Sequence, residues 1–206
     1  MAQERFEKTS AKRALDLYRS FILNESLKDK IANSNRTLVI LTIISYFGDC
    51  TKTKLKKAIP VASFDATIDE LISLGYITKR REGMEVHYSI GHSDDFSRET
   101  SEVSDETCFL FANTLMNIST YIKTYKITSW NIFSFMLEIA WKMEGSSVHL
   151  DEKSIESIKG LYANKMSTRK QLERMGIIKN IHPDSSGRSS GSDFRVNKEA
   201  YIIEVK

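Results

Sequence analysis

A short motif that occurs twice constrains the fold of this chain more than any other feature. Residues 71–77 and residues 172–178 both follow the pattern Leu-x-x-apolar-Gly-apolar-Ile. Glycine commonly ends an α-helix, and each glycine here is followed by apolar residues that favour a strand. Each copy also precedes a polar turn and more strand-like sequence. The repetition therefore predicts two structural units of one kind, in which a helix stops at glycine and a β-hairpin follows.

The helix that ends in the second copy is basic. It is predicted over residues 164–175 and contains four basic residues and a single acid, namely Lys165, Arg169, Lys170, Arg174 and Glu173. The strand after it leads to a tip at 182–193, which is rich in Ser and Gly and carries Arg188. Strand-like sequence returns at 194–196 and 201–205. A surplus of positive charge on one helix indicates contact with phosphate.

The first unit has the same order of predicted elements. An almost wholly apolar helix at 37–47 is followed by a short basic helix at 51–59 and by a third helix at 64–74, which ends in the first copy of the motif. A basic turn at 79–84 and a strand at 86–90 complete the unit. The basic residues of the short helix and the turn are Lys52, Lys54, Lys56, Lys57, Lys79, Arg80 and Arg81. All of these except Lys57 are predicted to contact phosphate.

The third helix of the first unit lacks the charge that a DNA-reading helix needs. Its outward positions include Asp65, Asp69 and Glu70 and no Lys or Arg. Carboxylates are repelled by a groove lined with phosphates, although one acid can accept a hydrogen bond from cytosine. Two alternatives stay open for this unit. It touches DNA only through its lysine helix and its basic turn, or it binds a protein.

The remaining sequence sets the domain division. At 206 residues the chain is long enough for two small domains. An acidic stretch at 91–107 is typical of a linker, and it divides the chain into an N-terminal domain at 1–90 and a C-terminal domain at 108–206. An amphipathic helix at 9–31 is expected either to pack on its own domain or to form a dimer contact.

Two further helices are expected in the C-terminal domain. Apolar residues follow helical spacing from Cys108 to Ile122, and a second helix is predicted at 130–143. The second helix is apolar nearly all round, which implies burial on more than one side. It is expected to form the core of the domain, with a two-fold interface as the alternative.

No set of residues in the sequence indicates catalysis. There is no glycine-rich nucleotide motif, no nucleophile elbow and no His-Glu-x-x-His zinc motif. Cys50 and Cys108 are isolated and the four histidines are scattered, so neither a disulfide nor a metal site is predicted. The N-terminus lacks the apolar segment of a signal peptide, and no apolar run is long enough to span a bilayer. We expect a cytoplasmic protein that is not an enzyme, needs no cofactor and does not bind a membrane.

At these residues the chain resembles the winged helix-turn-helix superfamily. Residues 172–178 and 184–195 are similar to the MarR-type regulators, in which a helix ending Leu-x-x-x-Gly-Leu/Ile-Ile precedes a wing rich in Asp, Arg and Ser. Tandem units of this kind also resemble plasmid replication initiators and the small dimeric subunits of chromosome-condensing SMC complexes. The resemblance implies a mainly α fold with small β-hairpin wings (α+β), made of two tandem winged helix-turn-helix domains. It also implies a DNA partner.

The main hypothesis is a sequence-specific protein of a bacterium, phage or mobile element that binds double-stranded DNA, with transcription regulation as its expected role. The helix at 164–175 is expected in the major groove, with Arg169 as the base-reading residue because Arg can pair bidentately with guanine. The other predicted contacts of this unit are Lys165, Ser167, Thr168, Lys170, Arg174 and, on the wing, Arg188.

A homodimer in the nucleoid would present two such helices to half-sites about one turn apart. The alternatives are a DNA-binding protein of plasmid or phage replication or partition, and a protein-interaction subunit of the SMC type. The sequence does not specify an effector ligand.

Overall fold

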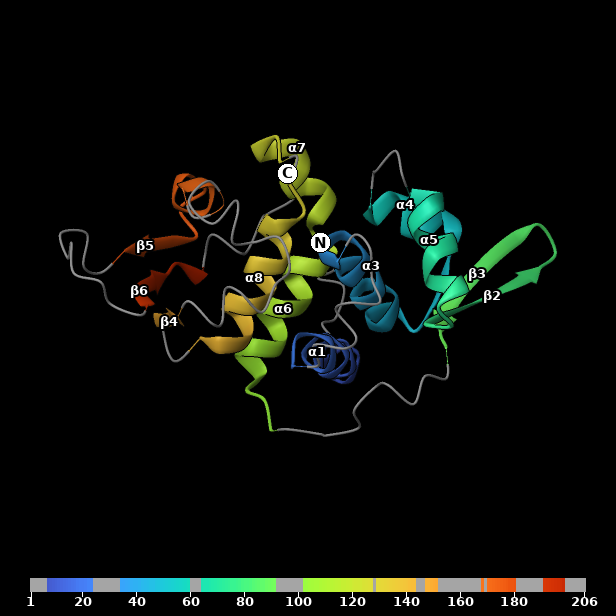
Figure 1. Cartoon of the computed structure of the whole chain (residues 1–206), viewed down its shortest axis with the longest axis horizontal. Helices are drawn as coiled ribbons and strands as arrows, with labels where there is room; N and C mark the ends of the chain where they lie inside the picture. The colour runs from blue at the N-terminus through green and yellow to red at the C-terminus, as the bar shows by residue number, and fades with distance from the viewer. Residues whose placement is uncertain are drawn as a thin grey trace.

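The structure of the chain is a computed structural model, and the residues it describes are 7–23, 34–59, 64–91, 102–127, 129–143, 147–151, 168, 170–180 and 191–198. Within them the chain is mostly helical, with two small antiparallel sheets. Helices form the centre of the molecule, and the two sheets lie at opposite ends (Figure 1). A mainly helical α+β fold is therefore confirmed.

The two halves of the chain repeat one order of elements, in which a helix leads into a strand and a hairpin ends the half. The first half consists of α1 (Lys8–Leu23), α3 (Ser34–Phe47), β1 (Asp49–Thr51), α4 (Lys52–Ala58), α5 (Phe64–Ser73), β2 (Ile77–Glu82) and β3 (Glu85–Ile90). The second consists of α6 (Asp105–Met116), α7 (Ile118–Tyr125), α8 (Asn131–Lys142), β4 (Ser147–Asp151), β5 (Ile178–Asn180) and β6 (Gly191–Val196). A helical turn at 170–174 precedes β5.

Both sheets have the same topology. Their strand orders are β1-β3-β2 and β4-β6-β5, so the last strand of each half lies between the other two. All neighbouring strands are antiparallel. Corresponding Cα partners are Cys50–Tyr88 and Ile77–Ile90 in the first sheet, and Val148–Phe194 and Ile178–Val196 in the second.

Both copies of the repeated motif form the same helix end. Gly75 and Gly176 have φ angles of 74° and 72°, which residues with a side chain rarely adopt. In the first copy, Gly75 N donates to Ile72 O and Tyr76 N donates to Leu71 O, each at 3.0 Å. The corresponding bonds of the second copy are also 3.0 Å long. This pair of bonds is the Schellman arrangement that ends many helices, and the predicted change from helix to strand at both glycines is confirmed.

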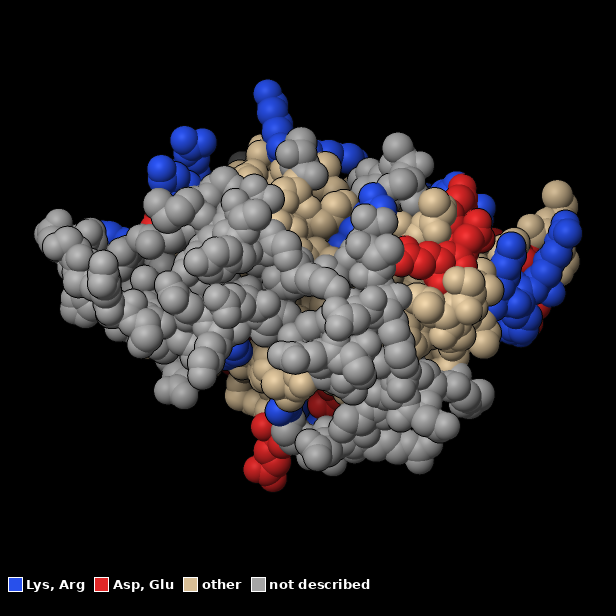
Figure 2. All heavy atoms as spheres, viewed as in Figure 1, with Lys and Arg blue, Asp and Glu red and all other residues tan. Residues whose placement is uncertain are grey.

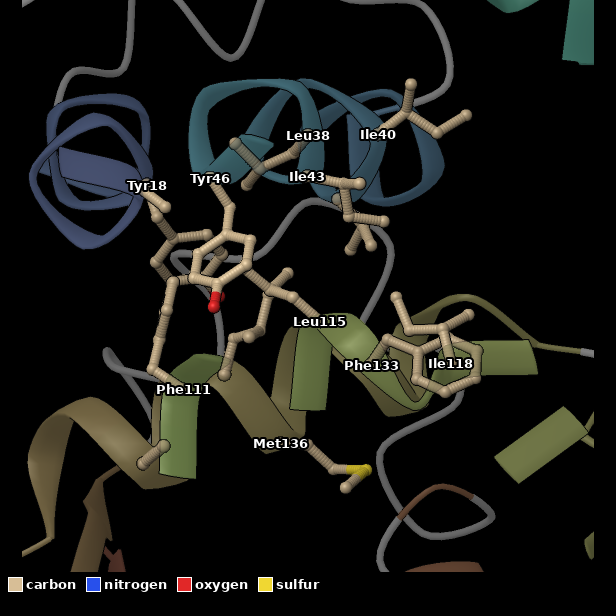
Figure 3. Close-up of a cluster of buried hydrophobic side chains, with 14 of the residues drawn as sticks. Tyr18, Leu38, Ile40, Ile43, Tyr46, Phe111, Leu115, Ile118, Phe133 and Met136 are labelled. Atoms are coloured by element: carbon tan, nitrogen blue, oxygen red, sulfur yellow. The ribbon is translucent and has the colours of Figure 1, made fainter. Parts of the chain in front are cut away.

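One hydrophobic core joins the two halves. α1 packs on α3 and α6, and both of these helices pack on α8. Tyr18 Oη of α1 donates to the carbonyl oxygen of Ser134 in α8 at 2.9 Å, and the Tyr18 ring meets the Phe111 ring edge-on with centroids 5.6 Å apart. Both rings are fully buried (Figure 3). The N-terminal helix thus packs within its own chain, and the domains predicted at 1–90 and 108–206 share a core.

The first helices of the two halves have the same spacing in the sequence, and they contact each other across the halves. α3 begins 26 residues after α1 (from 8 to 34), and α8 begins 26 residues after α6 (from 105 to 131). Lys8 and Asp105, the first residues of α1 and α6, form an ion pair. Asn35 Nδ2 donates to Asn131 Oδ1 at 2.5 Å, close to the starts of α3 and α8. The halves therefore meet through corresponding helices.

The helix expected from Cys108 to Ile122 is broken in two. α6 ends at Met116, and Asn117 leaves helical geometry with a ψ angle of 9°. Asn113 O accepts two hydrogen bonds from this residue, one from its backbone N at 3.1 Å and one from its side-chain amide at 2.9 Å. The break is invisible in the apolar pattern because α7 begins directly after Asn117, so apolar residues keep their helical spacing across it.

Candidate nucleic-acid interface

The lysine helix of the first half is α4. Thr51 caps it, because Thr51 Oγ1 accepts a hydrogen bond from Lys54 N at 3.2 Å. Leu55 is fully buried and fixes one face of this short helix on the core. The lysines lie on the other side, where Lys54, Lys56 and Lys57 are exposed and Lys52 is half-buried. The sequence of α4 thus folds with its charges at the surface.

Asp65 on α5 compensates the charge of two of these lysines. Its carboxylate oxygens lie 2.7 Å from Lys52 Nζ and 3.3 Å from Lys56 Nζ. The hydrogen bond from Lys52 lowers the pKa of Asp65, and the same bond raises the pKa of Lys52. Exposed ion pairs contribute little stability, but this one competes directly with any phosphate for both lysines. Figure 2 shows the acidic surface over α5.

The hairpin of β2 and β3 carries the other phosphate contacts predicted for the first unit. Arg80 forms ion pairs with Asp49 of β1 at 2.8 Å and with Glu82. Arg81 Nε donates to a carbonyl oxygen of the hairpin turn at 3.2 Å. Lys79 is exposed and, among the described residues, pairs with no carboxylate. Lys79 and Arg81 are therefore the charges that this hairpin leaves available for a ligand.

His87 of β3 lies among three carboxylates in the half of the hairpin nearer its turn. Its Nδ1 is 3.2 Å from Asp49 Oδ2, and its Nε2 is 3.6 Å from Glu82 Oε2 and 3.8 Å from Glu85 Oε2. Arg80 binds two of the same carboxylates. The network connects β1, β2 and β3, and it gives His87 a structural position within the sheet.

The predicted reading helix of the second half is described in part. Lys170 and Arg174 are exposed, whereas Leu172 is fully buried. Thr168 is 2% exposed. Because residues four apart share one helix face, Thr168 lies on the same buried face as Leu172, and this burial disfavours the predicted contact of Thr168 with DNA. Four predicted contacts, Lys165, Ser167, Arg169 and Arg188, lie outside the described residues.

α7 and its C-cap residue, Lys126, carry basic side chains that were not predicted to contact DNA. Lys123 and Lys126 are exposed, and neither pairs with a carboxylate within the described part of the chain. The apolar spacing of this segment predicts only its buried side. A second signal was present in the sequence, which contains no Asp or Glu between Glu106 and Glu138.

Neither a metal centre nor a reactive thiol is found among the described residues. They contain no group of three or more His, Cys, Asp or Glu side chains that could hold a metal ion. Cys50 is buried, and burial raises the pKa of its thiol to about 11, so the thiol stays protonated at neutral pH. No helix of the described ranges has the length and apolar character needed to cross a membrane.

No protein-family model, curated protein or solved structure matches this chain.

Proposed function

We propose that the chain is a sequence-specific protein that binds double-stranded DNA through two winged helix-turn-helix units and regulates transcription. The observation that carries the proposal is the repeated order of helix, strand, helical segment and hairpin, with the final strand in the middle of both sheets. This is the order expected of a winged helix. In helix-turn-helix proteins, the helix before the hairpin is the one that enters the major groove.

The two units have unequal roles in this proposal. α5 presents Asp65 and Asp69 to solvent, whereas the helical turn at 170–174 presents Lys170 and Arg174. Phosphates repel the first pair and attract the second. The second unit is therefore the DNA reader, and the first supports it through the hairpin and α4. Two chains in a homodimer would offer two reading helices to half-sites about one turn apart.

Arg169→Ala tests the reader. The substitution is expected to cost about 1–3 kcal/mol of binding free energy on a cognate site and to relax the preference for one base. The cognate site is first selected from a random duplex library. Fluorescence anisotropy then compares the variant on that site and on a scrambled duplex at two salt concentrations.

Lys179→Ala is the matched control, because Lys179 is an exposed lysine of β5. It is expected to change both affinities little. An equal loss of affinity for the cognate and scrambled duplexes would show that Arg169 contacts phosphate and not a base. An unchanged affinity for both duplexes would show that Arg169 does not contact DNA.

Asp65→Asn tests the support role of the first unit. It releases Lys52 and Lys56 from their ion pairs, so affinity for any duplex should rise several-fold at low salt, with unchanged sequence preference. Asp69→Asn removes the same charge from the same helix, but Asp69 makes no ion pair with a described residue, so its effect should be smaller. Anisotropy titrations of both variants give the comparison. Identical affinities for both variants and the unmodified protein would favour a protein partner for α5.

A further inference from the structure

α7 has one buried face and one basic face. Ile118 and Tyr121 are fully buried and anchor the helix on the core. Lys123, Thr124 and Lys126 are exposed. The helix contains no acidic residue, so nothing within its own sequence compensates the two lysines. Its polar surface consists of ammonium and hydroxyl groups, which are common phosphate ligands in protein–DNA complexes.

α4 extends this basic surface. It packs against α7 and adds the exposed lysines Lys54 and Lys57. Lys54 Nζ lies 4.1 Å from the centroid of the Phe47 ring, and this contact leaves its charge uncompensated. Within the described residues no carboxylate pairs with Lys54 or Lys57, whereas Asp65 engages the other two lysines of α4.

The two helices lie between the basic residues of the two halves. In Figure 1, α7 is at the upper edge, with the helical turn at 170–174 (orange) to its left and α4 to its right. Figure 2 shows Lys and Arg side chains projecting from this upper edge on both sides of α7 and again on the hairpin at the right. Separate groups of basic side chains therefore lie along this edge in both halves, and the acidic surface over α5 lies between α4 and the hairpin.

We propose that α7, together with Lys54 and Lys57 of α4, contacts the phosphate backbone of the same duplex that the second unit reads. The inference rests on the proposed DNA binding and assigns a central contact that joins the two units. Lysines and hydroxyl groups on one short helix fix the register of a duplex without reading bases. This contact is sequence-independent and adds to the salt dependence of binding.

The double variant Lys123→Gln/Lys126→Gln tests the contact in the full chain. Its affinity for a mixed-sequence duplex is measured by anisotropy over a range of salt concentrations. Removal of one lysine–phosphate contact should reduce the slope of log K against log salt by about 0.9, so the double variant should reduce it by about 1.8. Sequence preference should not change. Lys12→Gln, on α1 at the lower edge of Figure 1, removes one positive charge from elsewhere and should leave the slope unchanged.

A third variant, Lys170→Gln/Arg174→Gln, separates failure of this inference from failure of the proposed function. If it lowers the slope while Lys123→Gln/Lys126→Gln does not, DNA binding stands and the α7 contact is refuted. An equal reduction per removed charge by the α1 control would attribute the effect to net charge and also refute the contact. If the unmodified chain shows no salt-dependent binding, both proposals fail. Thermal unfolding by circular dichroism verifies that all variants fold.

Discussion

Phe111→Ala is expected to lower the free energy of unfolding by about 3–5 kcal/mol, since it leaves a ring-sized cavity in a core that cannot collapse freely. The Phe111 side chain is fully buried in α6 and meets the ring of Tyr18, which belongs to the first helix of the chain. Chemical denaturation followed by tryptophan fluorescence measures the loss. Phe109→Ala is the control, because Phe109 lies on the same helix but is only half-buried. It should cost clearly less.

The same variant distinguishes a shared core from two independent domains. Because Phe111 contacts α1, its removal should weaken the first half as well as the second. Hydrogen exchange should therefore accelerate in the β2–β3 hairpin, although residues 77–90 are remote in sequence from the substitution. Faster exchange confined to residues after 105 would show that the halves unfold separately, as the predicted division at 91–107 implies.

Gly91→Ala should cost at least about 2 kcal/mol although it adds a single methyl group, since overpacking against a fixed backbone is destabilising. A Cβ built on Gly91 lies 2.2 Å from the carbonyl oxygen of Gly75. Neither backbone segment can move away easily, because Gly91 N donates to Tyr76 O at 2.8 Å and Gly75 belongs to the Schellman helix end. Thermal and chemical unfolding of the purified variant measure the change.

Gly75→Ala provides the comparison for Gly91→Ala. Its Cβ would meet no atom within 4 Å, so only the left-handed φ angle opposes it, at about 1 kcal/mol. In the second half, Asn197 N donates to Ile177 O at 2.8 Å just as Gly91 N does to Tyr76 O, and Asn197 is exposed. The close approach to the glycine of the helix end thus occurs in the first half, whereas the second half accommodates a side chain at the corresponding position. A smaller loss for Gly91→Ala than for Gly75→Ala would contradict the close approach.

The sequence predicted those parts of the fold that depend on local bonds. The helix ends at Gly75 and Gly176 were predictable because a positive φ angle and two short-range hydrogen bonds define them. The shared core was not, because the partners of Tyr18 lie more than 90 residues away in α6 and α8. The break at Asn117 was missed since apolar spacing is the same on both sides of it.

The sequence predicted which segments of the candidate site are basic, but it did not predict which of their side chains are ion-paired or buried. Lys52, Lys54 and Lys56 were predicted alike to contact phosphate, yet Asp65 engages Lys52 and Lys56 and leaves Lys54 free for other contacts. Only the tertiary position of Asp65 beside α4 decides this. Thr168 was predicted to contact DNA as part of the helix at 164–175, whereas its side chain lies on the buried face of that helix.

The ion pair between Lys8 and Asp105 bears on how two similar units can be joined. A symmetric homodimer sets each residue on its two-fold axis against an identical copy of itself. In such an assembly a lysine at this position would face a lysine, and an aspartate would face an aspartate. Because the two halves here belong to one polypeptide, corresponding positions carry different residues, and opposite charges meet. Covalent linkage thus allows the two halves to place opposite charges at corresponding positions.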